Sequence, residues 1–377
     1  MTESKKRVNL TRRLTVDLLN TFNGINNHYY AAKAATAVAA SSNSIGAHGY
    51  TLLRKKPLGE GSSAEVHLAK RLKDGGLVAM KIARDDTKEF EPSTLMDAEK
   101  NALETLRHST HVVPLLDHFA IQGKRHLVFP YMQGGSLRQR IQARSGRPFV
   151  VEDIRSIVVQ VAHALRDMKK HNLVHGDLKP DNIMMIDPKE LHLCVIDFGM
   201  CNSADKAFDY LQTSWYRAPE VMLNVRRLYS GALDMWSLGC IVLEMATCLP
   251  AFARRSSRAQ IVNHVRQLGM YPAKLLEESE LSGQLFNRDC NGKWFPTFGL
   301  VTPPTFRMPV FQTRGADGKI GRAPKEYQKA MAHLVERMLD PDPETRMTPN
   351  EALAICNVHD DDDGGQEATK MVVEADG

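Results

Sequence analysis

The chain has 377 residues, of which 43% are hydrophobic and 25% are charged, so it can bury a large core in one large or two smaller domains. Its net charge of +5 is modest and includes no long basic block, so composition does not indicate a nucleic-acid partner. A membrane partner is not expected either. No window approaches the roughly 18 apolar residues that a membrane-spanning helix needs, and the best candidate, GCIVLEMA at 239–246, contains Glu244.

Six cysteines are scattered along the chain without Cys-x-x-Cys spacing. This pattern argues against a zinc ribbon and against a disulfide framework, and it favours a reducing compartment. The N-terminus also lacks the hydrophobic core of a signal peptide. We therefore expect an intracellular protein, in the cytoplasm, the nucleus or both.

The two ends of the chain differ in composition from its middle. Residues 1–48 begin with a basic, acid-poor segment and continue into an Ala/Ser-rich stretch, which predicts a partly helical or disordered extension. A mobile tail, a mitochondrial transit peptide and a nuclear import signal share this composition, and all three remain open. Residues 358–377 are acidic and lack apolar periodicity, which predicts a disordered tail.

From about residue 50 the sequence pattern predicts strands first and then helices. Short β-branched runs predict antiparallel strands at 51–58, 64–69 and 77–83, a helix at 93–107, and further strands at 112–119 and 125–130. Helical periodicity then dominates, with long helices near 151–171, 232–247 and 325–338. The expected fold is α+β, with a small sheet lobe at about 49–132 and a larger, mainly helical lobe at about 133–357.

A glycine-bearing loop and a strand lysine come early in this region. GEGSSA at 59–64 lies between two expected strands, where glycines let backbone N–H groups approach phosphate oxygens. By itself the loop is better explained as an ordinary hairpin turn. Lys81 follows about twenty residues later on a strand, and Glu99 lies on the next helix. A strand lysine below a phosphate loop, paired with a helical glutamate, suits the binding of α- and β-phosphates.

The polar loop VHGDLKPDNIMM at 174–185 supplies the remaining groups. Asp177 can accept a hydroxyl proton, Lys179 can neutralise charge on a transferred phosphoryl group, and Asn182 can offer a neutral oxygen to a cation. Asp197 follows an expected strand and is an anionic ligand suited to Mg²⁺. Each residue alone has an ordinary capping or turn explanation. The ordered set points to phosphoryl transfer, which consists mostly of positioning and charge neutralisation.

These motifs together resemble the eukaryotic protein kinases. The G-x-G loop, VAMK at 78–81, HGDLKPDN at 175–182, DFG at 197–199, APE at 218–220 and DMWSLG at 234–239 occur in the order of that family's signature set. The resemblance covers about residues 50–357. It implies a bilobal fold and an enzyme that uses ATP and Mg²⁺ to phosphorylate Ser or Thr hydroxyls of protein substrates.

The resemblance also implies roles for single residues. Asp177 would be the catalytic base, Lys81 and Glu99 the phosphate-anchoring pair, and Asn182 and Asp197 the Mg²⁺ ligands. Glu220 and Arg346 would form a buried structural pair. Phe129 matches the gatekeeper and Met132 the hinge residue that pairs with adenine. The implied ATP-binding set is Leu58, Gly59, Glu60, Gly61, Ser62, Ser63, Ala64, Glu65, Val66, Ala79, Lys81, Phe129, Met132 and Met184.

The activation segment, TSWYRAPE at 213–220, is similar to that of the group containing cyclin-dependent, mitogen-activated and dual-specificity tyrosine-regulated kinases. Residues 208–217 are closest to the tyrosine-regulated and splicing-kinase branches, where Tyr210 would be an activating, autophosphorylated tyrosine. The implied activation-segment residues are Tyr210, Thr213, Arg217 and Glu220. An insert at about 268–323 is also typical of this group and is an expected docking site for a partner.

Two departures from the group concern regulation. Gly176 and Ser214 stand where most of the group has arginines that hold a phosphorylated activation loop, which leaves Arg217 as the evident phosphate partner. We therefore expect that the loop is ordered without phosphorylation, or that a phosphate on Tyr210 contributes little to activity. Two other functions remain open: a pseudokinase scaffold, and a small-molecule phosphotransferase, which can carry the same H-G-D sequence.

Overall fold

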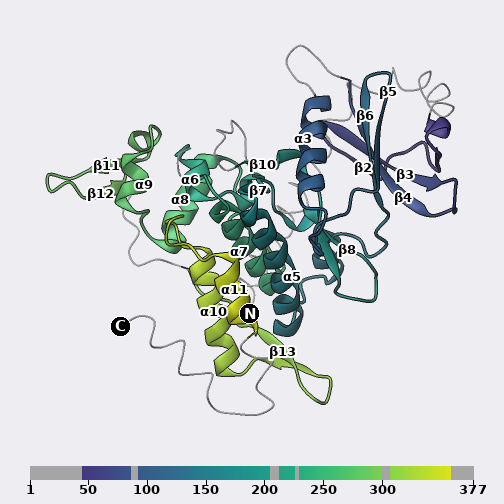
Figure 1. Cartoon of the computed structure of the whole chain (residues 1–377). Helices are drawn as coiled ribbons and strands as arrows, with labels where there is room; N and C mark the ends of the chain where they lie inside the picture. Colours follow the sequence, from purple (N-terminus) through teal and green to yellow (C-terminus); the bar gives the residue numbers. More distant parts are fainter. Residues whose placement is uncertain (1–44, 86–91, 204–211, 226–228, 299–305, 358–377) are drawn as a thin grey trace.

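Two lobes of different composition make up the molecule (Figure 1). The computed structural model describes residues 45–85, 92–203, 212–225, 229–298 and 306–357. A curled sheet with one long helix forms the first lobe, and packed helices form the second. The expected α+β bilobal fold is confirmed. Most of the expected partly helical or disordered N-terminal extension, residues 1–44, and the expected disordered tail at 358–377 lie outside the described residues.

The first lobe is built on an antiparallel sheet with the strand order β1-β3-β4-β6-β5, and β2 pairs with β3. Apolar side chains alternate along these strands, so one face of the sheet packs on α3 and the other carries a small core around Met80 and Val128. The bounds are β1 Tyr50–Leu52, β2 Gly59–Glu60, β3 Ala64–Arg71, β4 Leu77–Ala83, β5 Asp117–Ile121, β6 Lys124–Pro130 and α3 Pro92–Thr105.

Two predicted strands were wrong in extent, and a proline lies in each. The strand expected at 51–58 ends at Leu52, five residues before Pro57. The strand expected at 112–119 begins only at Asp117, because Pro114 has no N–H to donate to a ladder. Val112 forms an isolated parallel bridge with Val195, whose carbonyl accepts the Val113 N–H. That contact ties the first lobe to the second.

The second lobe is assembled around α7 (Ala232–Thr247), which is buried from Leu233 to Ala246. An almost wholly apolar helix of this kind belongs in the centre of a domain. A Cβ at Gly239 would lie 2.9 Å from side-chain atoms of Met338 and Leu339, so only glycine permits this close approach to α10. The surrounding helices are α4 Leu137–Ala143, α5 Val151–Lys170, α6 Pro219–Met222, α8 Ser257–Leu268, α9 Ala273–Glu277, α10 Lys325–Met338 and α11 Pro349–Asn357.

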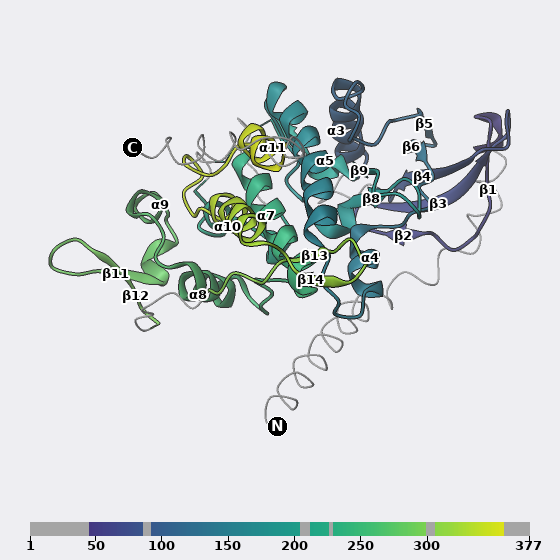
Figure 2. The ribbon, with the colours of Figure 1, turned by 90° about the horizontal axis from the view of Figure 1, so that it is seen from below.

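Short strand pairs complete the second lobe. Figure 2 shows the β13–β14 hairpin beside α4, and Val150 bridges to Gln312 of β13. The pairs are β7 Leu173–Val174 with β10 Asn202–Ser203, β8 Ile183–Met185 with β9 Leu193–Val195, β11 Phe286–Arg288 with β12 Trp294–Pro296, and β13 Gln312–Arg314 with β14 Ile320–Arg322. All six cysteines are free. Within the described ranges, no helix is long and apolar enough to cross a membrane.

Candidate active site

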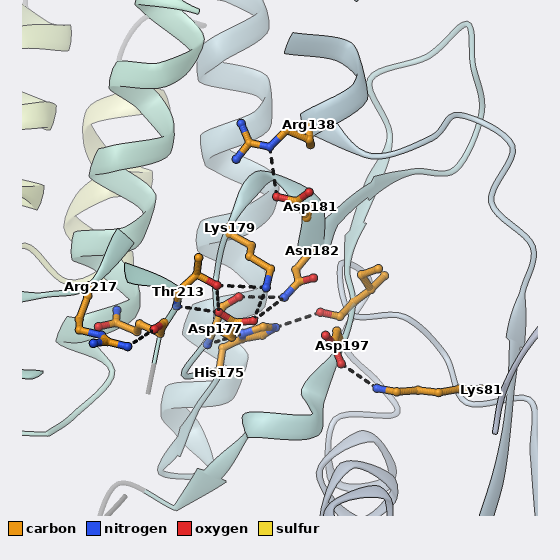
Figure 3. Close-up of polar contacts among 12 residues, drawn as sticks. Lys81, Arg138, His175, Asp177, Lys179, Asp181, Asn182, Asp197, Thr213 and Arg217 are labelled. Atoms are coloured by element: carbon orange, nitrogen blue, oxygen red, sulfur yellow. Dashed lines mark hydrogen bonds and ion pairs between the residues drawn. The ribbon is translucent and has the colours of Figure 1, made fainter. Parts of the chain in front are cut away.

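Asp177 lies in the loop between β7 and β8, and a dense set of hydrogen bonds fixes its carboxylate (Figure 3). The backbone N–H and the hydroxyl of Thr213 donate to Oδ1 at 2.9 and 2.7 Å. Lys179 Nζ donates to Oδ2 at 2.6 Å and also to the Thr213 hydroxyl at 3.1 Å. The structure therefore brings Asp177 and Lys179 together with a residue of the activation segment.

His175 joins this loop to the strand end that carries Asp197. Its Nδ1 accepts the Asp177 N–H at 3.2 Å, so its Nε2 carries the proton that bonds to the Ile196 carbonyl at 3.0 Å. The ring also meets Phe198 edge-on, with 5.0 Å between ring centroids. His175 thus fixes the position of Asp177 relative to Asp197.

Lys81, Glu99 and Asp197 form a second polar cluster. Lys81 Nζ donates to Glu99 Oε2 at 2.6 Å and to Asp197 Oδ1 at 2.7 Å. Burial opposes the charge of Lys81, but the two carboxylates outweigh it and raise the lysine pKa above its ordinary value. The Lys81 charge lowers the pKa of Asp197 to about 2. Asp197 therefore stays ionised at neutral pH, as a cation ligand must.

Glu99 differs from Asp197 because it is only 1% exposed. Burial raises its pKa, and the attraction of Lys81 opposes that shift. Its second oxygen accepts the Phe198 N–H at 3.3 Å. Glu99 accordingly links α3 to the segment that follows Asp197.

Asn182 and Asp197 present a donor set that fits Mg²⁺. Asn182 Nδ2 donates to the Asp177 carbonyl at 2.9 Å, which leaves the amide oxygen available, and Figure 3 shows that oxygen on the side of Asp197. Mg²⁺ is usually held by one or two such oxygens together with substrate phosphates. Within the described ranges, no group of three His, Cys, Asp or Glu side chains is placed to hold a metal ion.

The glycine loop takes the form of a tight β2–β3 hairpin. Gly61 N–H bonds to the Ala64 carbonyl at 2.9 Å, and Glu60, Glu65 and Gly61 all contact Arg84. Neither Gly59 nor Gly61 has positive φ, and a Cβ at Gly59 would meet nothing within 4 Å. Neither glycine is therefore needed for an unusual backbone conformation. The glycines leave open space, which a phosphate can approach.

Residues predicted for the adenine pocket lie on neighbouring strands. Ala79 of β4 stands directly opposite Phe129 of β6, and Val66 of β3 stands opposite Lys81. Phe129 and Met132 are buried, whereas the side chains of Val66, Ala79 and Met184 are half-buried. Leu58, Ser62 and Ser63 lie at or near the mouth of the glycine loop. The role of each of these residues in binding ATP stays a prediction.

Gly176, between His175 and Asp177, has φ +74°, a conformation that favours glycine. Both of its backbone polar groups are bonded. Its N–H donates to Asp234 Oδ1 at 3.1 Å, and its carbonyl accepts the Gln212 N–H at 2.6 Å. Asp234 Oδ2 also accepts the His175 N–H at 2.7 Å. Gly176 therefore connects this loop to α7 and to the activation segment through its backbone alone.

Gln212 holds the start of the described activation segment from within the core. Its side chain is 5% exposed and donates to the Leu233 carbonyl and the Ser237 hydroxyl, each at 2.8 Å. The same side chain accepts the Ala218 N–H at 2.9 Å. Gln212 immediately precedes Thr213, so this buried amide positions the residue that contacts Asp177.

We expect Gln212→Leu to lower the free energy of unfolding by about 1–3 kcal/mol, because the Ala218 N–H and the Leu233 carbonyl would lose a buried partner. Urea unfolding measures the change. Gln284→Leu is the matched control at an exposed position and should change stability by less than about 0.5 kcal/mol. Equal stability of the two variants would show that the buried amide does not hold the segment.

Arg217 was the expected phosphate partner, and Glu220 and Arg346 the expected structural pair. Arg217 Nη2 donates to the Gln212 carbonyl at 2.8 Å, so its guanidinium already bonds to the activation segment itself. Arg346 donates to both carboxylate oxygens of Glu220, at 2.7 and 2.9 Å, and both side chains are fully buried. Tyr210 lies outside the described residues.

A further network was not predicted from the sequence. Arg138 of α4 donates to Asp181 at 3.2 Å and also bonds to Glu244 and to the Tyr216 hydroxyl. Tyr216 in turn donates to Glu244 Oε2 at 2.6 Å. The bonds among Arg138, Tyr216 and Glu244 form a network that braces the activation segment against α4 and α7. Its members are spread over more than a hundred residues, and no local pattern in the sequence connects them.

Comparison with known proteins agrees with this geometry. A family model described as the protein kinase domain matches residues 52–356. The dual specificity tyrosine-phosphorylation-regulated kinase mbk-2 of Caenorhabditis elegans is 30% identical over 315 residues, covering 79% of this chain and 37% of that protein. The human dual specificity tyrosine-phosphorylation-regulated kinase 4 is 30% identical over 309 residues, covering 80% of this chain and 56% of that protein.

A third relative is the dual specificity protein kinase YAK1 of Saccharomyces cerevisiae, 29% identical over 238 residues, which cover 61% of this chain and 29% of that protein. The chain thus matches only part of each relative, from 29% of the yeast protein to 56% of the human protein. Because the kinase-domain match extends over most of its residues, the chain belongs to the protein kinase domain family.

Proposed function

We propose that this protein is an ATP- and Mg²⁺-dependent kinase that transfers the γ-phosphoryl group to Ser or Thr hydroxyls of protein substrates. The observation that carries the proposal is the arrangement of Asp177, Lys179 and Thr213 beside the Lys81–Glu99–Asp197 cluster. Positioning and charge neutralisation are the main requirements of phosphoryl transfer, and these residues supply both.

Each group has a defined task in this mechanism. The Asp177 carboxylate accepts two hydrogen bonds from Thr213 on Oδ1, and on Oδ2 one from Lys179 and a long one, 3.4 Å, from Asn182. A substrate hydroxyl would replace one of these donors, so that the carboxylate can orient it and take its proton. Lys179, beside that carboxylate, faces the charge that develops on the transferred group. Asn182 and Asp197 would hold Mg²⁺, which supplies charge neutralisation on the phosphates when bound. Lys81 would hold α- and β-phosphate oxygens while Glu99 orients it.

Two other classes of function can be distinguished from a protein kinase by which substrates, if any, they phosphorylate. A pseudokinase scaffold would bind partners without transferring phosphate, and a small-molecule phosphotransferase would use an amine or alcohol metabolite. The chain carries the buried Glu220–Arg346 pair and the Gln212 network, which build the platform beside Asp177. We expect labelled phosphate to enter Ser/Thr peptides and not choline or aminoglycosides. Transfer confined to the small-molecule panel would overturn the proposal.

We further propose that the acceptor residue is followed by proline. The Gln212 carbonyl, next to the residue that contacts Asp177, is already bonded to Arg217. A substrate residue with a backbone N–H would find this acceptor occupied, whereas proline has no N–H to satisfy. We expect kcat/KM about tenfold higher for a Ser-Pro peptide than for the matched Ser-Ala peptide, in line with the cost of an unsatisfied buried donor. Equal values would contradict it.

Tyr210 phosphorylation is expected to add little to activity. A phosphate orders a loop through arginine forks, and Gly176 and Ser214 provide none, while Arg217 already bonds to Gln212. Tyr210→Phe should therefore keep peptide phosphorylation within about tenfold of wild type, less than the effect of one strong charge-assisted contact. A hundredfold loss in a normally stable protein would show that the phosphate is required.

A further inference from the structure

The loop between α7 and α8 and the first turns of α8 form a basic surface that the proposed reaction does not use. Between Glu244 and Glu277 the chain contains no acidic residue, yet residues 254–266 include four arginines. Arg254, Arg258 and Arg266 line a surface hollow of about 400 Å³ together with Ser256 and Asn263. A hollow of this size can hold a small charged group and part of the peptide that bears it.

The charge of two arginines that line this hollow is not balanced by an acidic neighbour in the part of the chain that the structure describes. Among the described residues, neither Arg254 nor Arg258 has a carboxylate within ion-pair distance. Arg254 donates to the Ala253 carbonyl and to Asn263 Oδ1, each at 2.6 Å, and both acceptors are neutral. Burial without an anionic partner lowers the pKa of Arg254. An anion in the hollow would remove that penalty.

A buried amide donor also lines the hollow. Asn263 is only 7% exposed, and while its Oδ1 accepts from Arg254, its Nδ2 has no hydrogen-bond partner among the described residues. An unsatisfied buried donor costs about 1–3 kcal/mol. An incoming oxygen atom is the group that would satisfy it, so this amide indicates a ligand that accepts hydrogen bonds.

The N-terminus of α8 points to the same ligand. Ser256 caps the helix by accepting the Ala259 N–H at 3.2 Å, which places the first N–H groups of a twelve-residue helix beside the arginines. Helix N-termini favour anions through these free N–H groups and the helix dipole. Arginine forks, an amide donor and a helix N-terminus together match a tetrahedral oxyanion better than a single carboxylate.

The hollow lies close to the place where a peptide would bind. Gln260, one turn before Asn263 on α8, is buried and donates to the carbonyl of Ser214. Ser214 follows Thr213, which contacts Asp177. Figure 1 also shows α8 next to α6, the helix in which the activation segment ends. A peptide positioned on Asp177 can therefore extend to α8.

We propose that this hollow binds a phosphate group already present on a Ser or Thr of the peptide substrate, so that the protein favours substrates that another kinase has phosphorylated first. The selection of substrates rests on the proposed kinase function, whereas the binding of a phosphate group in the hollow does not. It concerns selection of the substrate and leaves the transfer chemistry unchanged.

The test uses a set of Ser-Pro peptides that carry one phosphoserine, moved stepwise along either side of the acceptor. We expect one position to raise kcat/KM about tenfold over the unphosphorylated peptide, mainly through KM, because the phosphate is bound equally before and during transfer. An Arg254→Ala/Arg258→Ala variant should bring that ratio close to one. Arg322→Ala, an exposed arginine on β14, should keep it.

A binding measurement separates this inference from the kinase proposal. Fluorescence anisotropy of the favoured phosphopeptide should show tighter binding than the unphosphorylated peptide, in wild type and in Asp177→Asn alike, with inorganic phosphate as competitor. Normal phosphorylation of unprimed peptides without any phosphopeptide preference would overturn the inference and leave the kinase proposal intact. Equally tight binding of single-stranded RNA, lost in the same arginine variant, would overturn the assignment to a phosphopeptide.

Discussion

Asp177→Asn should lower the rate of peptide phosphorylation by about 10²–10⁴-fold, the usual contribution of a general base. The amide is nearly isosteric with the carboxylate and cannot accept the proton of the substrate hydroxyl. It would also weaken the bond that Lys179 makes at 2.6 Å. Binding of ATP should persist because the Lys81–Glu99–Asp197 cluster makes no contact with the Asp177 carboxylate. Steady-state kinetics on one peptide measure the loss.

Asp181→Asn is the matched control for that experiment. Asp181 lies in the same loop, and its carboxylate is half-exposed and bonds to Arg138 rather than to the site. The same chemical change there should leave the rate close to that of wild type. If the two variants were equally active, Asp177 would not be the base. If both were inactive, the effect would come from the charge of the loop.

Arg346→Ala should destabilise the protein by about 3–5 kcal/mol, the cost of leaving a buried charge without its partner. Arg346 donates to both oxygens of Glu220, and neither side chain is exposed. It also donates to the carbonyls of Asp340 and Ala232, which would become unsatisfied. Chemical denaturation of the full chain, read by intrinsic fluorescence, gives the change in the free energy of unfolding.

Arg125→Ala provides a control, because Arg125 forms an ion pair of the same two-bond geometry at the solvent-exposed surface. Arg125 bonds to both oxygens of Asp97, at 2.8 and 3.0 Å, but both side chains are about 40% exposed. Removing that exposed pair should cost about 1 kcal/mol or less. A double variant, Glu220→Gln with Arg346→Met, should recover part of the stability, because no unpaired charge then remains buried. Equal losses in the two single arginine variants would contradict the role given to burial.

The sequence predicted those parts of the fold that depend on long periodic patterns. α7 and α10 have the predicted bounds, because an apolar or amphipathic run of about four turns leaves little choice of structure. The strand ends were less predictable. Val112 and Val113 have strong β propensity, but the residue they pair with, Val195, lies far along the chain, and Pro114 prevents their strand from continuing.

The site shows the same difference between what local patterns predict and what depends on distant partners. Asp177, Lys179 and Asn182 lie within one short loop, so their sequence order was enough to predict that they lie together. Gln212 and Arg138 act through partners in other elements, and an isolated Gln or Arg carries no pattern of its own. Gly176 was recognised as a departure from its group. Its bonds to Asp234 and Gln212 became evident only from the folded chain.

The most direct measurement is phosphorylation of an unbiased peptide library by the full chain, with labelled ATP at fixed concentration, in the presence and absence of Mg²⁺. We predict that phosphate enters Ser and Thr residues, preferentially before proline, and that transfer requires Mg²⁺ and is lost in Asp177→Asn. Tight binding of ATP without transfer to any peptide, by a folded protein with Mg²⁺ present, would contradict the account.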